Sequence, residues 1–449
     1  MNLKKIIIII VALSLGILAI TKIIEKKAYL HLEDLFNSSQ RNFVKKYLFP
    51  YKYISKQEKI IKSYYNMDHS FKASNKDILV GKMKDEKLSN NKILKRYNLV
   101  NGFYLGMNKV FPGSGFIDFD NENLIVLSSR GVIGYANDFE NQLNFKQIKN
   151  NIEEFININQ FLKHRSFSLK DLLIYESKVY VSYSQEIEDD CWNTSVIVAD
   201  MNYSNIKFKT LFSADECVHK FKNKDREFHP HPAGGRMVGV NSDHIVLTIG
   251  PYRSRFLAQD EKSVNGKLIK INVKNSNYEI ISMGHRNPQG LYYDKENNFL
   301  IETEHGPQGG DEINLIQVDR LNKNKIPNYG WAIVSAGEHY GGKISRNKEK
   351  YEKYPLFKSH SEYGFVEPLK SFVPSIGISE ITKIKNNKYV VSSLKDKSLY
   401  FFELNENREI INIKRVEVFE RVRDLKFKDD KLYFFLEDTP SIGIISFID

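Results

Sequence analysis

Short apolar runs separated by polar turns dominate the chain from about Tyr104 to its end. Pairs of such runs, joined by turns that contain Asp, Asn or Lys, recur with about a dozen residues per pair. They occupy residues 115–128, 237–249, 290–302, 378–394 and 422–436. The pattern predicts β-hairpins, and hairpins that repeat over about 350 residues favour a β-propeller over a sandwich.

The N-terminal residues follow a different pattern. Lys4 and Lys5 precede an uncharged run over residues 6–21, and three further lysines follow it. This arrangement is typical of a secretion signal or an anchor. As a helix the run is about 24 Å long, short of the ~30 Å membrane core, although flanking lysines extend its reach. Cleavage and anchoring both stay open.

The apolar run lacks a convincing small-residue cleavage site, which favours an uncleaved anchor. Residues 1–27 are therefore expected to hold the protein at the membrane, on the periplasmic side of the inner membrane. If the segment is cleaved, the protein is secreted to the periplasm. Residues 28–98 are rich in Lys and poor in Gly and Pro, and they predict a partly helical extension. The all-β propeller is expected over 99–449.

The charge distribution, the cysteines and the loops each bear on which classes of protein the sequence can belong to. The 66 Lys and Arg residues exceed the 55 Asp and Glu residues by 11, but they are scattered, so no nucleic acid partner is expected. Cys191 and Cys217 could pair in an oxidising compartment, and two buried free thiols are the alternative. No βαβ alternation with a glycine-rich phosphate loop is present, which argues against a Rossmann enzyme.

Candidate chemistry concentrates between residues 284 and 331. Arg286, Asn287 and Gln289 place a permanent cation and two amides at the entrance to a strand, which suits a planar, anionic ligand. In residues 304–312 (EHGPQGGDE), glycines and a proline allow backbone carbonyls to turn toward one point beside carboxylates. Oxygen ligands of this kind suit a hard cation such as calcium, and a tight charged turn is the alternative.

The motifs GHRNPQG, EHGPQGGDEINLI and NYGW resemble, in order and spacing, those of the soluble glucose/sorbosone and aldose sugar dehydrogenases that use pyrroloquinoline quinone (PQQ). The resemblance extends to residues 234–236, 248–250, 374–376, 393–395 and 421–425. The resemblance is strong over the C-terminal half, faint over residues 115–130 and absent from the residues before 115. It implies a six-bladed propeller that oxidises the anomeric hydroxyl of an aldose or related sugar to a lactone. PQQ would accept the hydride, and a respiratory acceptor would take the electrons.

The resemblance also implies roles for individual residues. His231 would be the catalytic base, with His229 as a rival, and Arg286 would stabilise negative charge on the quinone oxygen. The remaining candidates would hold the cofactor: Asn287 and Gln289 at its edge, and Lys395, Arg421 and Arg423 at its carboxylates. Gly306 and Pro307 would offer carbonyls to a calcium ion at the quinone. Asp311, Glu312 and Tyr329 resemble a neighbouring structural calcium site.

The chain departs from the family pattern at three places. Pro232 stands where the histidine is usual, so that His231 lies five residues before Arg236. Pro251 stands where an aspartate usually orients the histidine, and Phe372-Val373 replaces a Trp-x-Thr-type contact. The alternative function is accordingly a catalytically degenerate propeller that binds a carbohydrate or a protein partner.

Overall fold

The computed structural model describes residue 54 and residues 77–89, 91–99, 114–156, 158–319, 324–340 and 348–447. The chain forms two compact units, and the strands discussed below all belong to the unit that comprises Asn66–His339 and Lys348–Asp449. The predicted segment 1–27 lies outside the described residues, and so does the predicted extension except for residue 54, residues 77–89 and residues 91–98.

Within the described part of the chain, no helix combines the length and the apolar character needed to cross a membrane. The prediction of a membrane-anchored protein on the periplasmic side of the inner membrane is corrected on this finding. The segment that suggested it, residues 1–27, is not among the described residues.

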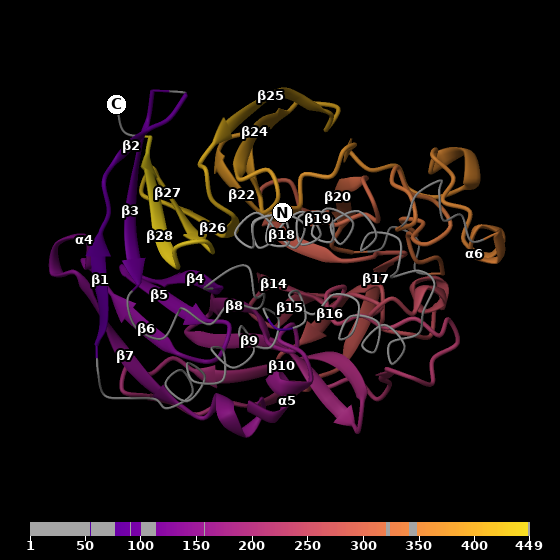
Figure 1. Ribbon diagram of the computed structural model, residues 1–449, viewed down its shortest axis with the longest axis horizontal. Coiled ribbons are helices and arrows are strands. Elements are labelled where there is room, and N and C mark those ends of the chain that lie inside the picture. Colours follow the sequence, from indigo (N-terminus) through magenta and orange to yellow (C-terminus); the bar gives the residue numbers. More distant parts are fainter. Residues whose placement is uncertain are drawn as a thin grey trace, which may run out of the picture. The chain divides into compact units, whose positions relative to one another are not determined.

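Antiparallel sheets that follow one another along the chain build the main unit (Figure 1). One four-stranded sheet contains β14 (Gly234–Asn241), β15 (His244–Ile249), β16 (Lys267–Asn272) and β17 (Tyr278–Met283). The next contains β18 (Pro288–Asp294), β19 (Phe299–Glu304), β20 (Asp311–Gln317) and β21 (Lys370–Phe372). A third contains β22 (Ile378–Lys385), β23 (Lys388–Ser393), β24 (Ser398–Leu404) and β25 (Ile410–Glu417).

Two larger sheets complete the unit. A five-stranded sheet contains β8 (Leu169–Tyr175), β9 (Lys178–Glu188), β10 (Cys191–Asp200), β12 (Lys209–Phe212) and β13 (Val218–His219). The central path of an eleven-stranded sheet contains β26 (Val422–Lys428), β27 (Lys431–Leu436), β28 (Ser441–Ser446), β3 (Ile93–Leu99), β1 (Ile78–Lys82), β7 (Asn144–Asn150), β6 (Ile133–Ala136), β5 (Asn123–Ser128) and β4 (Gly115–Asp120). β2 (Glu86–Lys87) and β11 (Asn205–Ile206) pair at its side.

Helices in the described residues are short and lie between strands. They are α4 (Phe139–Gln142), η1 (Ile152–Glu154), α5 (Ile158–Lys163), η2 (Arg255–Gln259), α6 (Lys348–Lys353) and η3 (Ser361–Tyr363). The mostly-β part of the fold prediction is therefore confirmed.

The sheets pack face to face around a common axis. The first strands, β4, β8, β14, β18, β22 and β26, contact one another in this order, and β26 contacts β4. Apolar clusters combine residues of consecutive sheets: one contains Ile133 and Val181, and another contains Ile301 and Ile378. A third cluster contains Val126 of β5 and Ile442 of β28, which come from opposite parts of the eleven-stranded sheet. This closed arrangement is a propeller-type architecture.

Burial explains why the strands read as apolar runs in the sequence. Every residue of β19 is buried, whereas the outer strand β25 is mostly exposed. A strand that neighbouring sheets cover on both faces needs a continuous apolar run rather than alternation. All five predicted hairpins are present, as β4–β5, β14–β15, β18–β19, β22–β23 and β26–β27. In each, the first strand lies at the axis.

A strand from the N-terminal side completes the last sheet. β3 pairs with β28, with Asn98 opposite Ser441 and Leu94 opposite Ile445 (Figure 1). β1 in turn pairs with both β3 and β7. The sequence interpretation placed these strands in the extension, because two isolated short runs carry no signal of a partner some 340 residues away.

A buried arginine connects the strands at the axis. Arg236 of β14 is 2% exposed, and its Nη1 atom lies 2.7 Å from Asp171 Oδ1 and 2.9 Å from Asp424 Oδ1. The same atom lies 2.9 Å from Glu380 Oε2. Since these carboxylates come from β8, β26 and β22, one guanidinium links four inner strands. Its Nε atom donates to the carbonyl of Gln289 in β18, at 2.8 Å.

The carboxylates around the axis also bind the backbone of neighbouring inner strands. The backbone donors are Met237 N to Asp171 (2.8 Å), Leu291 N to Glu380 (2.9 Å), Ile117 N to Asp424 (2.7 Å) and Ile174 N to Asp118 (2.7 Å). Because an unpaired buried N–H group is costly, these bonds fix how each inner strand is placed against the next. Lys426 of β26 joins them, since its Nζ atom lies 3.4 Å from Asp118 Oδ1. We call Asp118, Asp171, Arg236, Glu380, Asp424 and Lys426 the axial network.

Carboxyl groups outnumber cations in the axial network. Burial raises the pKa of Glu380 to about 8, and the carboxylates of Asp424 and Asp171 add to the effect that Arg236 opposes. Burial likewise raises the pKa of Asp171 to about 6. The axial network therefore keeps a proton at neutral pH.

This proton predicts a pH dependence of stability. Between the ordinary pKa of a glutamic acid, 4.5, and its folded-state value of about 8, the folded protein binds more protons than the unfolded chain. The free energy of unfolding should therefore fall as the pH rises through this range. Glu380→Gln, which imitates the protonated group, should make the decrease between about pH 6 and 8 shallower than in the wild type and retain the part due to Asp171 and the other buried carboxyl groups. Denaturant unfolding across pH measures both. A wild-type profile that is flat above pH 6 would contradict the account.

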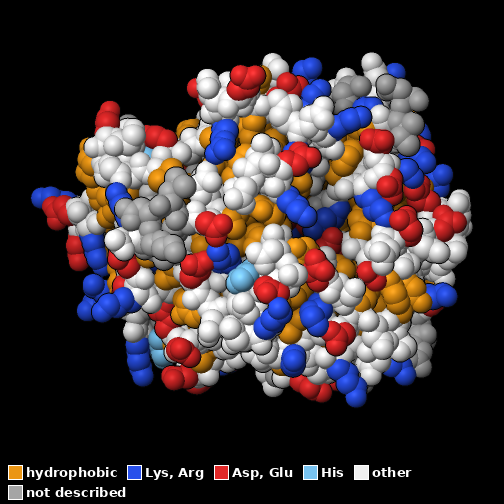
Figure 2. All heavy atoms as spheres, turned by 180° about the vertical axis from the view of Figure 1, so that it is seen from behind, with side chains coloured by type: hydrophobic (Ala, Val, Ile, Leu, Met, Phe, Trp, Pro, Cys, Tyr) orange, Lys and Arg blue, Asp and Glu red, His pale blue; other side chains and the backbone are white. Residues whose placement is uncertain are grey.

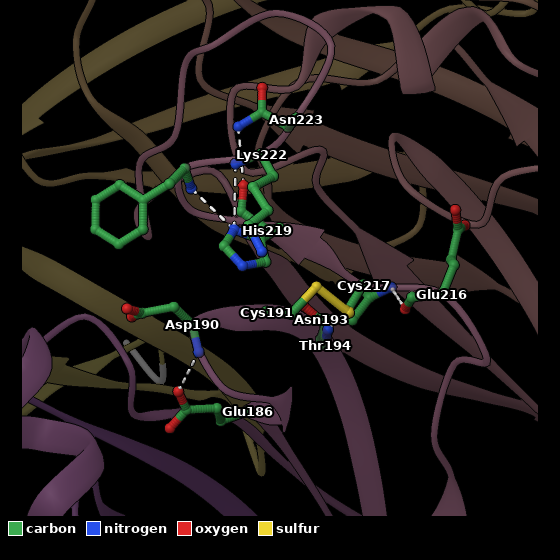
Figure 3. Close-up of a disulfide and its surroundings, with 11 residues drawn as sticks. Glu186, Asp190, Cys191, Asn193, Thr194, Glu216, Cys217, His219, Lys222 and Asn223 are labelled. Carbon is green, nitrogen blue, oxygen red and sulfur yellow. Dashed lines mark hydrogen bonds between the residues drawn. A yellow bond between two sulfur atoms is a disulfide. The ribbon is translucent and has the colours of Figure 1, made fainter.

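A disulfide connects Cys191 and Cys217, which confirms the predicted pairing (Figure 3). The Cα atoms lie 5.3 Å apart, and 26 residues separate the two positions. Cys191 begins β10, and Cys217 immediately precedes β13, which pairs with β10 at Trp192 and Val218. The bond therefore ties the segment after β12 to the edge of its own sheet.

Loss of the disulfide should weaken the folded state without changing the fold. For a loop of this length, the double variant Cys191→Ser/Cys217→Ser should lose about 2–4 kcal/mol of unfolding free energy. Guanidinium unfolding without reductant measures the loss, and the wild type in reductant should match the variant. An unchanged midpoint in the variant would show that the bond contributes nothing.

Candidate functional site

A cavity of about 140 Å³ opens at the N-terminal ends of the inner strands. Its walls come from several sheets and are lined by Phe116, Ser166, Lys170, His231, Gly234, Asn287, Gln289, His305, Leu394, Arg421, Arg423 and Glu437. We call it the axial cavity. Figure 2 shows one face of the molecule, where Lys and Arg side chains gather at a hollow near the middle.

Five of the predicted site residues meet in the axial cavity. They are His231, Asn287, Gln289, Arg421 and Arg423. Arg286 borders it, since its Nη1 atom donates to the carbonyl of His305 at 2.7 Å, while its guanidinium lies 5.3 Å from the ring centre of Trp331. Residues far apart in the sequence converge here because they occupy equivalent positions at the starts of β14, β18 and β26.

Lys395 lies elsewhere. It lines a separate outer cavity of about 570 Å³ together with Val373, Tyr400 and Arg415, and its Nζ atom donates to the carbonyl of Ser375 at 3.1 Å. The structure therefore does not bring Lys395 together with Arg421 and Arg423 in the axial cavity. Leu394 lines the axial cavity, whereas the next residue, Lys395, lines the outer cavity.

The two arginines share one carboxylate. Arg421 Nε donates to Glu437 Oε2 at 2.9 Å and Arg423 Nε donates to Glu437 Oε1 at 2.8 Å. Burial opposes ionisation of Glu437, but Arg423 and Arg421 hold its pKa below the usual value. Arg423 also donates to Gln289 Oε1 at 3.0 Å. One net positive charge is left, which an anionic ligand could neutralise.

His231 is placed by its histidine neighbours. Its ring centre lies 4.3 Å from that of His229 and 5.8 Å from that of His164, and its backbone N–H donates to His229 Nδ1 at 3.2 Å. His231 lines the cavity and is exposed to solvent, whereas His229 is partly buried and is not a lining residue. Desolvation by the surrounding protein atoms, followed by the nearby His229 and His164, lowers the pKa of the His231 imidazole, so the ring is neutral at neutral pH.

Among the described residues no carboxylate pairs with His231. Pro251 occupies the place where the sequence analysis expected an aspartate, and the backbone around it pairs with the histidine loop instead. Tyr252 N donates to the Pro232 carbonyl at 2.8 Å, and His229 N donates to the Tyr252 carbonyl at 2.9 Å. The loop is therefore held by its backbone and not by an ion pair to the imidazole.

The predicted calcium ligands are divided between two environments. Asp311 is fully engaged, because its carboxylate accepts hydrogen bonds from Ser375 Oγ (2.5 Å), Gly377 N (2.7 Å), Ile378 N (3.0 Å) and Gly306 N (3.2 Å). Asp311 thus holds the loop after β19 against the start of β22. Gly306 and Pro307 are not lining residues of the axial cavity. Tyr329 donates its hydroxyl to the Leu315 carbonyl at 2.6 Å.

Glu312 belongs to a buried acidic cluster that the sequence analysis did not recognise. Glu312 and Asn314 of β20 lie opposite Glu304 and Glu302 of β19, so the four side chains share one face. The rings of His285 and His360 approach the same carboxylates, with His285 Nδ1 3.5 Å from Glu304 Oε1 and His360 Nε2 3.6 Å from Glu312 Oε1.

Several atoms of this cluster lack hydrogen-bond partners, namely His285 Nδ1, Glu302 Oε1, Asn314 Oδ1 and His360 Nε2. Burial and the neighbouring Glu304 raise the pKa of Glu302 and of Glu312 well above the usual value. A buried set of oxygen and nitrogen atoms without donors fits a cation better than the engaged carboxylate of Asp311 does.

Lys170 also lines the axial cavity, and no motif in the sequence predicted it. It follows Leu169 in β8, where Lys170 and Asp171 interrupt an otherwise apolar run. The sequence held one signal for this site, because two adjacent charged residues are unusual in a strand that is otherwise apolar and buried.

The fold and the cavity define a propeller-type protein with a cation-rich axial site. Residues 169–445 match the model of the Glucose / Sorbosone dehydrogenase family, and the chain belongs to this family. Two curated relatives are similar. Aldose sugar dehydrogenase YliI of Escherichia coli is 28% identical over 289 residues, 59% of this chain and 71% of that protein. The protein slr1608 of Synechocystis sp. is 29% identical over 211 residues, so the chain spans 43% of its length and 45% of this chain is matched.

Solved structures show the same fold. A glucose dehydrogenase superposes with a TM-score of 0.60 at 18% identity, covering 75% of this chain and 96% of that chain. The soluble aldose sugar dehydrogenase of Escherichia coli, in its apo form, gives a TM-score of 0.55 at 21% identity, with 74% and 94% covered. The family resemblance inferred from the motifs is thereby confirmed.

Proposed function

We propose that the protein is a quinone-dependent sugar dehydrogenase that oxidises the anomeric hydroxyl of an aldose or related sugar to a lactone. The observation that carries the proposal is the meeting of a neutral histidine, His231, with the guanidinium groups of Arg421 and Arg423 in one cavity. The relatives' names support it, because one is an aldose sugar dehydrogenase and another, 33% identical over 96 residues (19% of this chain and 18% of that protein), is quinoprotein glucose dehydrogenase B of Acinetobacter calcoaceticus.

The donor set of the axial cavity fits PQQ, a planar quinone that carries carboxylates. Arg421 and Arg423 supply guanidinium groups for carboxylates, and Asn287 and Gln289 supply amides for the polar edge. When bound, PQQ supplies an electrophilic carbon that accepts hydride. Arg286, at the border, is placed to stabilise negative charge on an oxygen in the cavity.

His231 acts as the base. Because its ring is neutral, one nitrogen is free of a proton and accepts the proton of the sugar hydroxyl. The low pKa makes this imidazole a weak base, and no described carboxylate stabilises the imidazolium that forms. Proton acceptance by His231 should therefore be slower than in a site with an orienting carboxylate.

The proposed architecture has six blades. The eleven-stranded sheet is divided at β1 into a first blade, β4 to β7, and a last blade that β3 completes. With the four remaining sheets this gives one blade for each of the inner strands β4, β8, β14, β18, β22 and β26.

Titration of the purified chain with PQQ in the presence of calcium, followed by dye reduction with a panel of aldoses, tests the function. The wild type should bind PQQ and turn over. His231→Ala should lower kcat by about 10²–10⁴-fold with PQQ affinity retained, since the base is lost. The matched variant His229→Ala should retain most of the activity.

Other outcomes decide against parts of this account. A loss of kcat in His229→Ala, with activity retained in His231→Ala, would make His229 the base. PQQ binding without turnover would favour the degenerate carbohydrate-binding propeller, which the absence of an acid at Pro251 would explain. Failure of the wild type to bind PQQ would overturn the proposed function.

A second part of the proposal concerns calcium. The buried acidic cluster of Glu302, Glu304 and Glu312 holds the cation, while Asp311 serves the loop. Calcium at 100 times its Kd should stabilise the wild type by about 2.7 kcal/mol, seen as a rise in Tm. Glu312→Gln should abolish the rise, and Glu296→Gln, at an exposed acid next to β18, should retain it. An undiminished rise in Glu312→Gln would place the cation elsewhere.

A further inference from the structure

Lys170 and Ser166 form a polar corner of the axial cavity that no motif in the sequence predicted. Lys170 is 9% exposed and Ser166 is 2% exposed, and both line the cavity. Lys170 Nζ donates to the backbone carbonyl of Ser166 at 2.5 Å. Among the described residues no carboxylate forms an ion pair with Lys170, and the Ser166 hydroxyl has no hydrogen-bond partner.

The position of Lys170 in the fold is unfavourable for a charged ammonium group. Burial disfavours the charge of its ammonium group, and the nearby Arg423 adds to this effect. Two buried cations that face one space repel each other, and an anion between them would offset both the repulsion and the lost hydration. The other charges around the cavity do not supply that anion, because Glu437 is already shared by Arg421 and Arg423.

A glycine makes room for this lysine. Gly235, which precedes Arg236 of the axial network, has a φ of +113°, and a Cβ atom there would lie 2.3 Å from Lys170 Cβ. Any other residue at position 235 would displace Lys170. The same segment therefore places Arg236 in the axial network and allows Lys170 to reach the cavity.

We propose that Lys170 and Ser166 form a carboxylate-binding subsite of the axial cavity, opposite Arg423 and next to His231. The ammonium group and the hydroxyl each donate a hydrogen bond to a ligand carboxylate, and Arg423 faces the same anion. The inference rests on the proposed function for the identity of the ligand. The carboxylate can belong to the cofactor or to an acidic sugar, and binding measurements distinguish the two.

The subsite has a pH signature. Burial, with Arg423, lowers the pKa of Lys170 to about 7, so the empty cavity loses this charge as the pH rises above neutrality. The other groups that face the cavity keep their charge state between pH 6.5 and 8.5. The pKa values of His231, His229 and His305 are lowered, Glu437 is held ionised by Arg421 and Arg423, and the arginines stay cationic. A carboxylate is ionised throughout, so its affinity should follow the protonation of Lys170.

Calorimetric titrations of the full chain at pH 6.5 and 8.5 test the subsite. One arm uses PQQ alone, and the other compares D-glucuronate with neutral D-glucose on the PQQ-loaded protein. For the ligand that carries the carboxylate, wild-type affinity should fall from pH 6.5 to 8.5. Lys170→Met should weaken binding at pH 6.5 by about tenfold or more, as expected for loss of a charged hydrogen bond. Lys170→Arg should retain binding and lose the pH dependence.

Controls and outcomes make the result decisive. Lys178→Met, at an exposed lysine of the adjacent strand β9, should match the wild type. An effect in the PQQ arm assigns the carboxylate to the cofactor, and an effect restricted to D-glucuronate assigns it to an acidic sugar. PQQ binding that Lys170→Met and Lys170→Arg both leave unchanged, with no effect on D-glucuronate, overturns the subsite alone. No PQQ binding by the wild type overturns both proposals. If Lys170→Met does not fold, the pH profile of Lys170→Arg decides.

Discussion

The interaction of Arg236 with three buried carboxylates is the constraint on which the rest of the structure depends. A guanidinium has a fixed planar set of donors, so it fixes the relative placement of β8, β14, β22 and β26 more closely than apolar packing could. The carboxylates in turn bind backbone N–H groups of adjacent inner strands. Because the residues of the axial cavity occupy the ends of these same strands, the geometry of the axial network determines the geometry of the cavity.

Charge is distributed unequally along this axis. Within the axial network, carboxyl groups outnumber cations and retain protons, whereas the cavity at the strand ends has more cations than carboxylates. Gln289 and Arg423 take part in both regions, since their carbonyls bind Arg236 while their side chains line the cavity. Binding of an anion in the cavity therefore acts on strands that the axial network already holds in place. Such a site is prepared before the ligand arrives.

Much of the fold could be predicted from the sequence, because its elements are local. A hairpin such as 422–436 needs only neighbouring runs and a turn, and every hairpin that was predicted formed. The pairing of β3 with β28 could not be predicted, since nothing in either strand specifies a partner at the other end of the chain. The hairpin of β8 and β9 was missed because charged Lys170 and Asp171 interrupt its apolar pattern.

The placement of residues in the axial cavity could be predicted where it follows from their position at the start of a strand, as for Asn287 and Arg423. The placement of Lys395 could not be predicted, because neighbouring residues of one strand end can point their side chains into different cavities. The environment of Asp311 could not be predicted either, because its carboxylate accepts hydrogen bonds from residues far away in the sequence. The acidic cluster of Glu302, Glu304 and Glu312 depends on strand register, which the motifs do not reveal.

The central claim is that the axial cavity binds a carboxylate-bearing quinone between His231 and the guanidinium groups of Arg421 and Arg423, at the start of β26. A crystal structure of the full chain grown with PQQ tests it most directly. The account predicts electron density for the quinone in the axial cavity. Its carboxylates should face Arg421 and Arg423, and His231 should lie on the side of the quinone that faces solvent. Density in the outer cavity beside Lys395 and Val373, or an axial cavity that holds solvent under saturating PQQ, would contradict it.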